Sequence, residues 1–361
     1  MKSNKTHHAL SSFSGERADD LGETNMSQYK KLSTGKKAAV IASAAAVGGT
    51  AVCFAAANML YSFALVPDSP FNMQKIMMKQ LEGDTAKVSS DKSISTQKYS
   101  GFGGDENTKT WFEENKTDVY ITSEDGFKLH GYELHNRNAA SKYIIACHGF
   151  SSQASEMKSA VKHLYDPGYT VIAVDARAHG ESEGKVRGMG CPERRDIIKW
   201  IGYINQKDPD AKIALYGVSM GAATVLSASG EPDFPDNVFA VVEDCGYTSI
   251  WDEFSVQMKN MFHLPTFPLL NAASVVTRVR AGYSFRDASA LEQVGKSKTP
   301  TLFIHGDSDS FVPFSMLDRL YNAASCEKQK LVVKGADHAL SSMTEPALYW
   351  NTVEDFLKKH E

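Results

Sequence analysis

One stretch decides the fold of this chain: Ile213-Ala-Leu-Tyr-Gly-Val-Ser-Met-Gly-Ala-Ala-Thr224. It passes from an apolar, β-like run through Gly-x-Ser-x-Gly into small residues that favour helix, so it predicts a strand, a tight turn and a helix. Such a turn strains the backbone of the central serine, and a side chain at either flanking position would collide with the neighbouring strand or helix, which explains both glycines. Ser219 would then project its hydroxyl from the sheet edge, and the N–H of Met220 would face a developing oxyanion.

A catalytic serine needs a base to take its proton and an acid to orient that base, and in this architecture the acid and then the histidine follow the serine. Residues 301–313 form a buried-strand pattern that ends in an acid-rich turn containing Asp309. Residues 330–339 form another strand pattern that ends in a loop containing His338. Gly-x-Ser-x-Gly alone also occurs in ordinary loops, so the prediction of a triad of Ser219, Asp309 and His338 depends on all three strand ends.

At these motifs the chain resembles the α/β-hydrolase superfamily, and within it the membrane-anchored bacterial hydrolases of the YqkD-like and serine-aminopeptidase-like groups. The segments that carry the resemblance are His148 to Phe150, Asp175 to Gly184, Gly217 to Gly221, Asp244 to Tyr247, His305 to Pro313 and the His338 loop. The resemblance implies a mostly parallel twisted sheet flanked by helices, with a small helical lid, preceded by an N-terminal transmembrane helix. It also implies that the backbone N–H of Phe150 joins that of Met220 in an oxyanion hole.

Four other polar residues compete for catalytic roles. Asp244 is the rival acid, because some hydrolases of this fold carry theirs after that strand, but the Gly-x-x-Asp-x-x-Val-Pro setting of Asp309 matches the family's acid. Asp307 lies two positions early and is interpreted as a loop-capping residue. His148 and His179 are interpreted as structural, since the first can orient the oxyanion loop and the second has no later acid in register.

The order of elements in the predicted hydrolase domain follows from the hydrophobic pattern. Residues 119–122 and 128–134 flank an Asp-Gly pair, which predicts antiparallel opening strands. Apolar strands then alternate with helices, which predicts right-handed parallel crossovers. The loop at 175–184 matches the family pattern Asp-x-Arg-Gly-His-Gly-x-Ser-x-Gly, except that Ala178 replaces the first glycine. A closing helix is expected from about Glu345 to Lys359.

Composition excludes several classes of function. The 361 residues carry a net charge of -4, with no basic run interleaved with aromatic residues, so we expect no nucleic-acid partner. The five cysteines contain neither a Cys-x-x-Cys pair nor zinc-ligand spacing, which argues against a disulfide framework and a metal site. The predicted chemistry requires no metal or organic cofactor.

The N-terminal region predicts a membrane anchor. Residues 1–35 are polar and are expected to form a disordered cytoplasmic tail. Residues 36–66 are expected to form a transmembrane signal anchor, because no charged side chain occurs from Ala38 to Val66 and about 20 residues suffice to cross a bilayer. Four lysines on the N-terminal side predict that the N-terminus is inside and the hydrolase outside the cytoplasm. A buried soluble helix and a cleaved signal peptide are the alternatives.

Two more regions complete the predicted organisation. Residues 67–117 are expected to form a stalk with a packing helix between Asn72 and Leu81, and residues 118–361 the hydrolase domain. A lid insertion is expected at 247–294, rich in aromatic residues and methionine. These side chains would either line a pocket for an acyl or aryl group or form the core of a small cap.

The function predicted from these features is that of a serine hydrolase acting on a carboxylic ester, thioester or amide through an acyl-enzyme. The substrate would be a small-molecule or lipid-like acyl compound. A peptidase or acyltransferase of the same fold is one alternative. A non-catalytic, membrane-tethered binding module is another, and reaction with a serine-directed probe would separate it from an enzyme.

Overall fold

The computed structural model describes residues 34–70, 72 and 103–361. The predicted cytoplasmic tail lies outside these residues except for its last two positions, and the predicted packing helix lies outside them beyond Asn72. The chain divides into two units, Met1–Cys53 and Phe54–Glu361. The second unit therefore begins inside the segment predicted to be an anchor.

Helix α2 (Thr34–Leu65) contains that segment except for its last residue, Val66. Among the described residues it is the one helix long and apolar enough to cross a bilayer, over Gly48–Leu65. In its last three turns, which belong to the second unit, Ala57, Tyr61 and Leu65 are buried. One face of the C-terminal end of α2 therefore packs against the rest of that unit.

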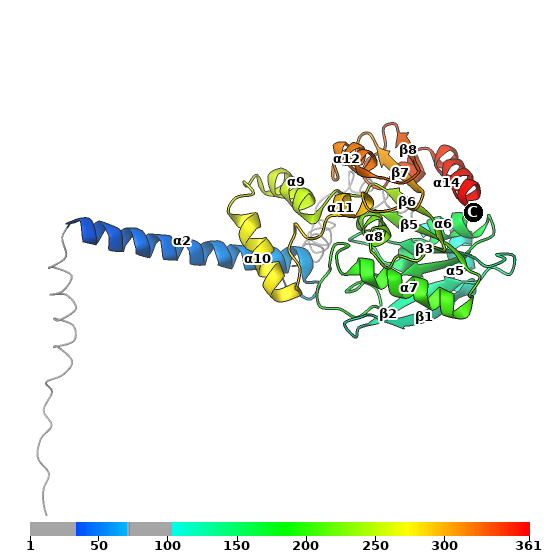
Figure 1. Cartoon of the computed structure of the whole chain (residues 1–361), viewed down its shortest axis with the longest axis horizontal. Helices are drawn as coiled ribbons and strands as arrows, with labels where there is room; N and C mark the ends of the chain where they lie inside the picture. Colours follow the sequence, from blue (N-terminus) through cyan, green and yellow to red (C-terminus); the bar gives the residue numbers. More distant parts are fainter. Residues whose placement is uncertain (1–33, 71, 73–102) are drawn as a thin grey trace, which may run out of the picture. The chain divides into compact units, whose positions relative to one another are not determined.

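A single sheet forms the centre of the second unit (Figure 1). Its strand order is β1-β2-β4-β3-β5-β6-β7-β8. The strands are β1 (Lys116–Thr122), β2 (Lys128–Leu134), β3 (Lys142–Cys147), β4 (Thr170–Val174), β5 (Lys212–Val218), β6 (Val238–Asp244), β7 (Thr301–Gly306) and β8 (Lys328–Val333). Strands β1 and β2 form the predicted antiparallel hairpin and β2 pairs antiparallel with β4, whereas all later neighbours are parallel. The prediction of antiparallel opening strands followed by parallel crossovers is confirmed.

Helices cover both faces of the sheet (Figure 1). One layer holds α5 (Glu106–Asn115), α6 (Lys158–Tyr165) and α14 (Pro346–His360), whose buried side chains join alternate strand residues in a continuous apolar core. The other layer holds α7 (Glu193–Lys207), α8 (Met220–Ser229), α11 (Ala290–Val294) and α12 (Ser315–Ala323), with α8 packed directly on β5 and β6. Two short turns, η2 (Ala154–Glu156) and α13 (Ser341–Thr344), complete the connections. The predicted closing helix is confirmed as α14, shifted by one residue at each end.

The segment predicted as a lid contains three helices with different surroundings. Helices α9 (Ile250–Phe262) and α10 (Leu269–Ala281) follow β6 and extend beyond the sheet (Figure 1). Helix α11 packs against α8 and so belongs to the layered core. We therefore use the name cap for α9, α10 and the connection between them.

Helix α5 was not predicted from the sequence. Asp105 caps its N-terminus by accepting a hydrogen bond from the N–H of Thr108, and Phe112 is fully buried against α6 and the sheet. The Phe112 and Tyr132 rings meet edge to face at 5.5 Å. A short helix with one buried aromatic residue has too weak a periodicity to stand out in a polar segment.

Candidate active site

The turn between β5 and α8 has the geometry that its glycines predicted. Ser219 adopts φ 55° and ψ −113°, a strained combination for a residue with a side chain. A Cβ on Gly217 would lie 2.3 Å from the carbonyl oxygen of Gly221, and a Cβ on Gly221 would lie 2.1 Å from that of Cys147. The backbone N–H of Ser219 donates to Asp244 O over 2.8 Å, which fixes the turn against β6.

Three strand ends bring Ser219, His338 and Asp309 together. The Ser219 hydroxyl lies 2.9 Å from His338 Nε2, and His338 Nδ1 lies 2.8 Å from Asp309 Oδ2. A carboxylate accepts hydrogen bonds, so the proton of the neutral imidazole belongs on Nδ1, and Nε2 is left to accept from the serine. Ser219 follows β5, Asp309 follows β7 and His338 follows β8, which places all three at the carboxyl edge of the sheet.

Asp309 is held by four hydrogen-bonding groups. Its Oδ1 accepts from the N–H groups of Phe311 and Val312 at 2.9 and 2.8 Å. Its Oδ2 faces His338 and also His305 Nε2, which lies 3.2 Å away. Burial alone would raise the pKa of Asp309, but the hydrogen bonds from His305 and His338 outweigh it and lower the pKa to about 2. The carboxylate is therefore ionised at every pH at which the protein is expected to work.

The rival acids occupy other positions. Asp244 is buried and accepts a hydrogen bond from the Tyr349 hydroxyl at 3.0 Å, and burial raises its pKa to about 6. Asp307 accepts from the N–H of Gly335 at 2.7 Å and thereby ties together the loops after β7 and β8. The interpretation of Asp307 as a loop-capping residue is confirmed, and the direct partner of His338 is Asp309.

The predicted oxyanion-hole donors lie beside the serine. Within the part of the chain that the structure describes, neither the Phe150 N–H nor the Met220 N–H donates a hydrogen bond to a protein group. A Cβ on Gly149 would lie 3.5 Å from that of Ser219, so the loop after β3 runs directly past Ser219. The arrangement agrees with the expectation that these two N–H groups form an oxyanion hole, which stays a prediction.

Two histidines hold that loop, as expected from the sequence. His148 Nδ1 lies 2.7 Å from Gly149 O, and its Nε2 accepts from the N–H of Ala176 at 3.0 Å. His179 Nε2 lies 2.7 Å from Phe150 O. Both histidines thus contact backbone groups of this loop, in agreement with their interpretation as structural residues.

Comparisons with known proteins agree with this architecture. Residues 138–266 match the serine aminopeptidase family, S33. An uncharacterised protein of Bacillus subtilis, YqkD, is 30% identical over 243 residues, which cover 67% of this chain and 79% of the relative. This chain belongs to the α/β-hydrolase superfamily.

Solved structures of other α/β-hydrolases are similar in fold. The esterase Pf2001 of Pyrococcus furiosus shares 25% identity and a TM-score of 0.55, with 68% of this chain and 92% of that chain covered. The acylaminoacyl peptidase of Pyrococcus horikoshii shares the fold at 19% identity and a TM-score of 0.53, with 68% of this chain and 41% of that chain covered. Hydrolases of esters and of peptides therefore both occur among the neighbours in fold.

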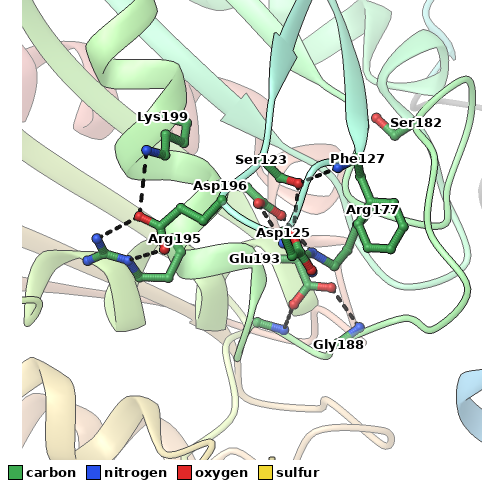
Figure 2. Close-up of polar contacts among 12 residues, drawn as sticks. Ser123, Asp125, Phe127, Arg177, Ser182, Gly188, Glu193, Arg195, Asp196 and Lys199 are labelled. Atoms are coloured by element: carbon green, nitrogen blue, oxygen red, sulfur yellow. Dashed lines mark hydrogen bonds and ion pairs between the residues drawn. The ribbon is translucent and has the colours of Figure 1, made fainter. Parts of the chain in front are cut away.

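Charged groups brace the loop at 175–184 of this α/β-hydrolase (Figure 2). Arg177 donates two hydrogen bonds to Asp196 of α7, at 2.8 and 2.6 Å, and also contacts Asp125 in the hairpin turn at 2.8 Å. The predicted loop of salt bridges and turns is confirmed. Ala178, which replaces the family's glycine, has φ 60° and so lies in the left-handed region.

An apolar pocket opens at Ser219. Its walls come from α9, α10, the loops after β3 and β7, and the C-terminal end of α2. The cap contributes aromatic and methionine side chains to these walls. This supports the interpretation that the side chains of residues 247–294 line a pocket. The apolar lining residues from the cap are Phe254, Met258, Met261, Phe262, Leu270 and Ala273, and those from α2 are Leu60, Tyr61, Phe63 and Ala64. Two polar residues of α9, Glu253 and Gln257, also line the pocket.

Three contributions to this site were missed from the sequence. The contact of α2 with the pocket left one signal, since the uncharged run from Ala38 to Val66 exceeds the length that a bilayer needs. His305 was recognised only as part of a motif, and its contact with the Asp309 carboxylate was not predicted. Phe311, whose ring lies 5.1 Å from that of His338, had no signal beyond its place near Asp309.

Two clusters among the described residues have metal-binding atoms close together. In the first, Cys245 lies near Asp309 and His338, but the latter two bond to each other, and burial raises the pKa of the Cys245 thiol, which disfavours a thiolate ligand. The second joins Asp118, His130 and Glu181, but both ring nitrogens of His130 already lie within 3.0 Å of a carboxylate, Nδ1 beside Asp175 and Nε2 beside Asp118. Hydrogen bonding accounts for both arrangements.

Proposed function

We propose that this protein is a membrane-anchored serine hydrolase that cleaves carboxylic esters. The observation that carries the proposal is the hydrogen-bonded chain from Ser219 through His338 to Asp309, which opens onto an apolar pocket. A serine, a histidine with an acceptor nitrogen facing it, and a buried carboxylate behind that histidine are the parts that acyl transfer needs. Nothing in this chemistry requires a metal ion.

In the first half of the reaction, Ser219 Oγ attacks the acyl carbon while His338 Nε2 takes the hydroxyl proton. The carbonyl oxygen becomes an oxyanion and accepts hydrogen bonds from the N–H groups of Phe150 and Met220. The tetrahedral intermediate then collapses, the bond to the leaving oxygen breaks, and His338 gives its proton to the departing alcohol. The acyl group remains on Ser219 as an ester.

In the second half, His338 takes a proton from a water molecule, whose oxygen attacks the acyl carbon. A second tetrahedral intermediate collapses with return of the proton to Ser219, and the free acid leaves. Asp309 stabilises the imidazolium formed in both halves and keeps the ring oriented. Loss of one oxyanion donor typically costs about 100- to 1,000-fold in rate.

The lining of the pocket favours an acyl group of apolar character. Ester cleavage is preferred because the esterase Pf2001 shares 25% identity with this chain over most of its own length. The match to the serine aminopeptidase family and the peptidase of the same fold keep amide cleavage as the second candidate. Comparing matched aryl ester and anilide substrates would decide between these two.

The proposed location is the cell membrane, with α2 as a single-pass anchor. Its length and apolar composition support a span, and the lysines before it favour an N-terminus inside. The catalytic domain would then face the extracytoplasmic side. Protease digestion of intact cells would leave the domain untouched if this orientation were wrong.

The test of the catalytic proposal uses the full chain in detergent and a fluorophosphonate probe. Wild type is expected to be labelled, Ser219→Ala to be unlabelled, and His338→Ala to react at least about 100-fold more slowly because its general base is gone. Ser308→Ala is the matched control, since Ser308 is exposed and its hydroxyl contacts Asp307 rather than the triad. Failure of folded wild type to react would instead support the non-catalytic binding module.

A further inference from the structure

The last turns of α2 form a wall of the active-site pocket. Leu60, Tyr61, Phe63 and Ala64 line the same apolar pocket as Ser219. These residues belong to the helix that is also the candidate membrane span. The element proposed to hold the protein in the bilayer therefore reaches the site of acyl transfer.

Contacts with the cap fix this end of α2. The Phe63 and Phe262 rings meet edge to face at 5.7 Å, which joins α2 to α9. Arg280 of α10 donates to Asn58 Oδ1 at 2.6 Å, and its guanidinium lies 4.7 Å from the Tyr61 ring centre. Both cap helices thus contact the end of α2, so the position of this helix end fixes the position of the cap.

The candidate span of α2 ends where the pocket begins. Its apolar window is Gly48–Leu65, and the uncharged run continues to Val66. The α2 residues that line the pocket lie in the last two turns of this window. A span that uses this window brings the pocket to the depth of the lipid headgroups.

The outer surface of the cap is apolar. Val275 and Val279 lie one helical turn apart on α10 and are 51% and 80% exposed. Phe267, in the connection from α9, is 74% exposed, and Met59 of α2 is 55% exposed. Exposed apolar side chains that gather on one element mark contact with a partner or a membrane, and α10 is tied to the end of α2 through Arg280 and Asn58.

The charge of the cap fits an anionic lipid surface. From Phe254 to Arg286 the sequence has no aspartate or glutamate. The basic residues of this segment, all exposed, are Lys259, Arg278, Arg280 and Arg286. Arg278 pairs with Asp287, just beyond the segment, and Arg280 donates to Asn58. Basic residues beside exposed apolar ones are the combination that binds the interface of anionic membranes.

The one acidic group in the pocket wall is compatible with an apolar chain. Glu253 is 2% exposed, and burial raises its pKa to about 8. At neutral pH the side chain is therefore mostly protonated and uncharged. An acyl chain in the pocket would not meet a buried carboxylate.

We propose that the substrate is an ester-linked acyl lipid of the membrane that holds α2, and that its acyl chain passes from the bilayer to Ser219 between α2, α9 and α10. The apolar surface of α10 docks on the same membrane, and the exposed Lys259 and Arg286 of the cap segment bind anionic headgroups. This inference rests on the proposed hydrolase function and on the proposed anchor, and it deepens them by naming the substrate class.

The test reconstitutes the full chain in vesicles of phosphatidylethanolamine and phosphatidylglycerol that carry a long-chain monoacylglycerol. Fatty acid release from the vesicles is compared with cleavage of a water-soluble aryl butyrate in the same sample, and the ratio of the two rates is the readout. Val275→Asp/Val279→Asp is expected to lower this ratio at least about tenfold, which corresponds to about 1.4 kcal/mol of docking free energy. Leu348→Asp, which places a charge on an exposed apolar position of α14, is expected to leave the ratio unchanged.

A second variant tests the wall made by α2. Ala64→Trp narrows the pocket from the anchor side, so the preferred acyl chain of a series of aryl esters is expected to shorten. Ala55→Trp is the control, because Ala55 is exposed on the same helix and does not line the pocket. An unchanged chain-length preference for Ala64→Trp would contradict the placement of the acyl chain against α2.

The outcomes separate the two proposals. If wild type neither reacts with the fluorophosphonate probe nor cleaves the soluble ester, the proposed hydrolase function fails. If wild type does both but releases no fatty acid from the vesicles, or if the charged α10 variant keeps the wild-type ratio, the lipid inference alone is overturned. If that variant instead converts a dimer to a monomer, the apolar surface of α10 binds a second copy of the chain and not the membrane.

Discussion

Ala178 is a single residue whose backbone conflicts with its side chain. Its φ of 60° lies in the left-handed region, where a Cβ destabilises the backbone by about 1 kcal/mol and glycine is not strained. We therefore expect Ala178→Gly to increase the free energy of unfolding by about 0.5–1 kcal/mol in denaturant titrations. The same change inside α6, Ala160→Gly, is expected to lower it by about 1 kcal/mol. Destabilisation by both changes would show that no strain is relieved at Ala178.

Glu253 makes stability depend on pH. Its pKa in the folded protein is about 8, above the ordinary value of 4.5, so the folded state binds this proton more tightly than the unfolded state. The stabilisation is complete below about pH 4.5 and is lost as the pH rises through about 8, by roughly 1.4 kcal/mol per pH unit between these values.

Glu253→Gln removes this proton and keeps the shape of the side chain that accepts from Gln257. Unfolding free energies measured from pH 5 to 8 are expected to fall less steeply for this variant than for wild type. Glu243, which is buried and has a pKa of about 8, keeps its own contribution in both proteins. Parallel curves for the two proteins would mean that Glu253 ionises normally.

The limits of sequence analysis are visible at single residues. Ser219 and His338 could be predicted because each stands at a strand end in a recognisable local pattern. Asp309 was preferred over Asp244 on its setting alone, and its 2.8 Å contact with His338 depends on how the loop after β8 folds back, which no local pattern encodes. His305 stands in a recognised motif, but its support of Asp309 depends on the orientation of a buried ring, which that motif does not encode.

At the scale of elements, the turn at Ser219 brings β5, α8 and β3 into close contact. A Cβ on Gly221 would lie 2.1 Å from Cys147 O, so Gly221→Ala must push α8 away from the end of β3. We expect a loss of about 3 kcal/mol or more in unfolding free energy, together with loss of probe labelling. Gly202→Ala in α7 is the matched control, because a Cβ there meets nothing within 4 Å. It is expected to stabilise the protein by about 0.5–1 kcal/mol, and equal effects at the two glycines would contradict the steric argument.

Most elements could be predicted because their patterns are local. The hairpin of β1 and β2, the parallel strands and α14 all have a strong hydrophobic period or a clear turn. Helix α5 escaped because its packing depends on one residue, Phe112. The contact of α2 with the cap escaped for a different reason. A long apolar run has the pattern of a membrane span along its whole length, and only packing shows that its end contacts α9 and α10.

At the scale of the whole molecule, charge and apolar surface are unevenly distributed. The chain has a net charge of -4, yet the cap segment from Phe254 to Arg286 carries only basic charge. The same segment holds several of the most exposed large apolar side chains among the described residues. An enzyme held against an anionic bilayer can use this surface to orient its pocket.

The burial of the α2 end predicts where the folded unit begins. Ala57, Tyr61 and Leu65 are buried, and the carbonyl oxygen of Leu65 accepts from the N–H of Arg187 at 2.8 Å. A chain that starts at Phe54 keeps these contacts, whereas one that starts at Asp68 loses them and opens the pocket on one side. Burial of a Tyr and a Leu side chain contributes about 3 kcal/mol or more, so the shorter chain is expected to melt about 6–12 °C lower.

Thermal unfolding of the two truncated chains in the same mild detergent measures this difference, and probe labelling at low temperature reports whether each active site is formed. The shorter chain is also expected to lose its preference for long acyl esters while it still reacts with the probe, because the triad lies on the sheet and the lost wall lies on α2. Equal melting temperatures and equal chain-length preferences would mean that α2 is a tether alone. In that case residues 58–65 would have to leave the pocket in solution, and the route from bilayer to Ser219 would have no wall on that side.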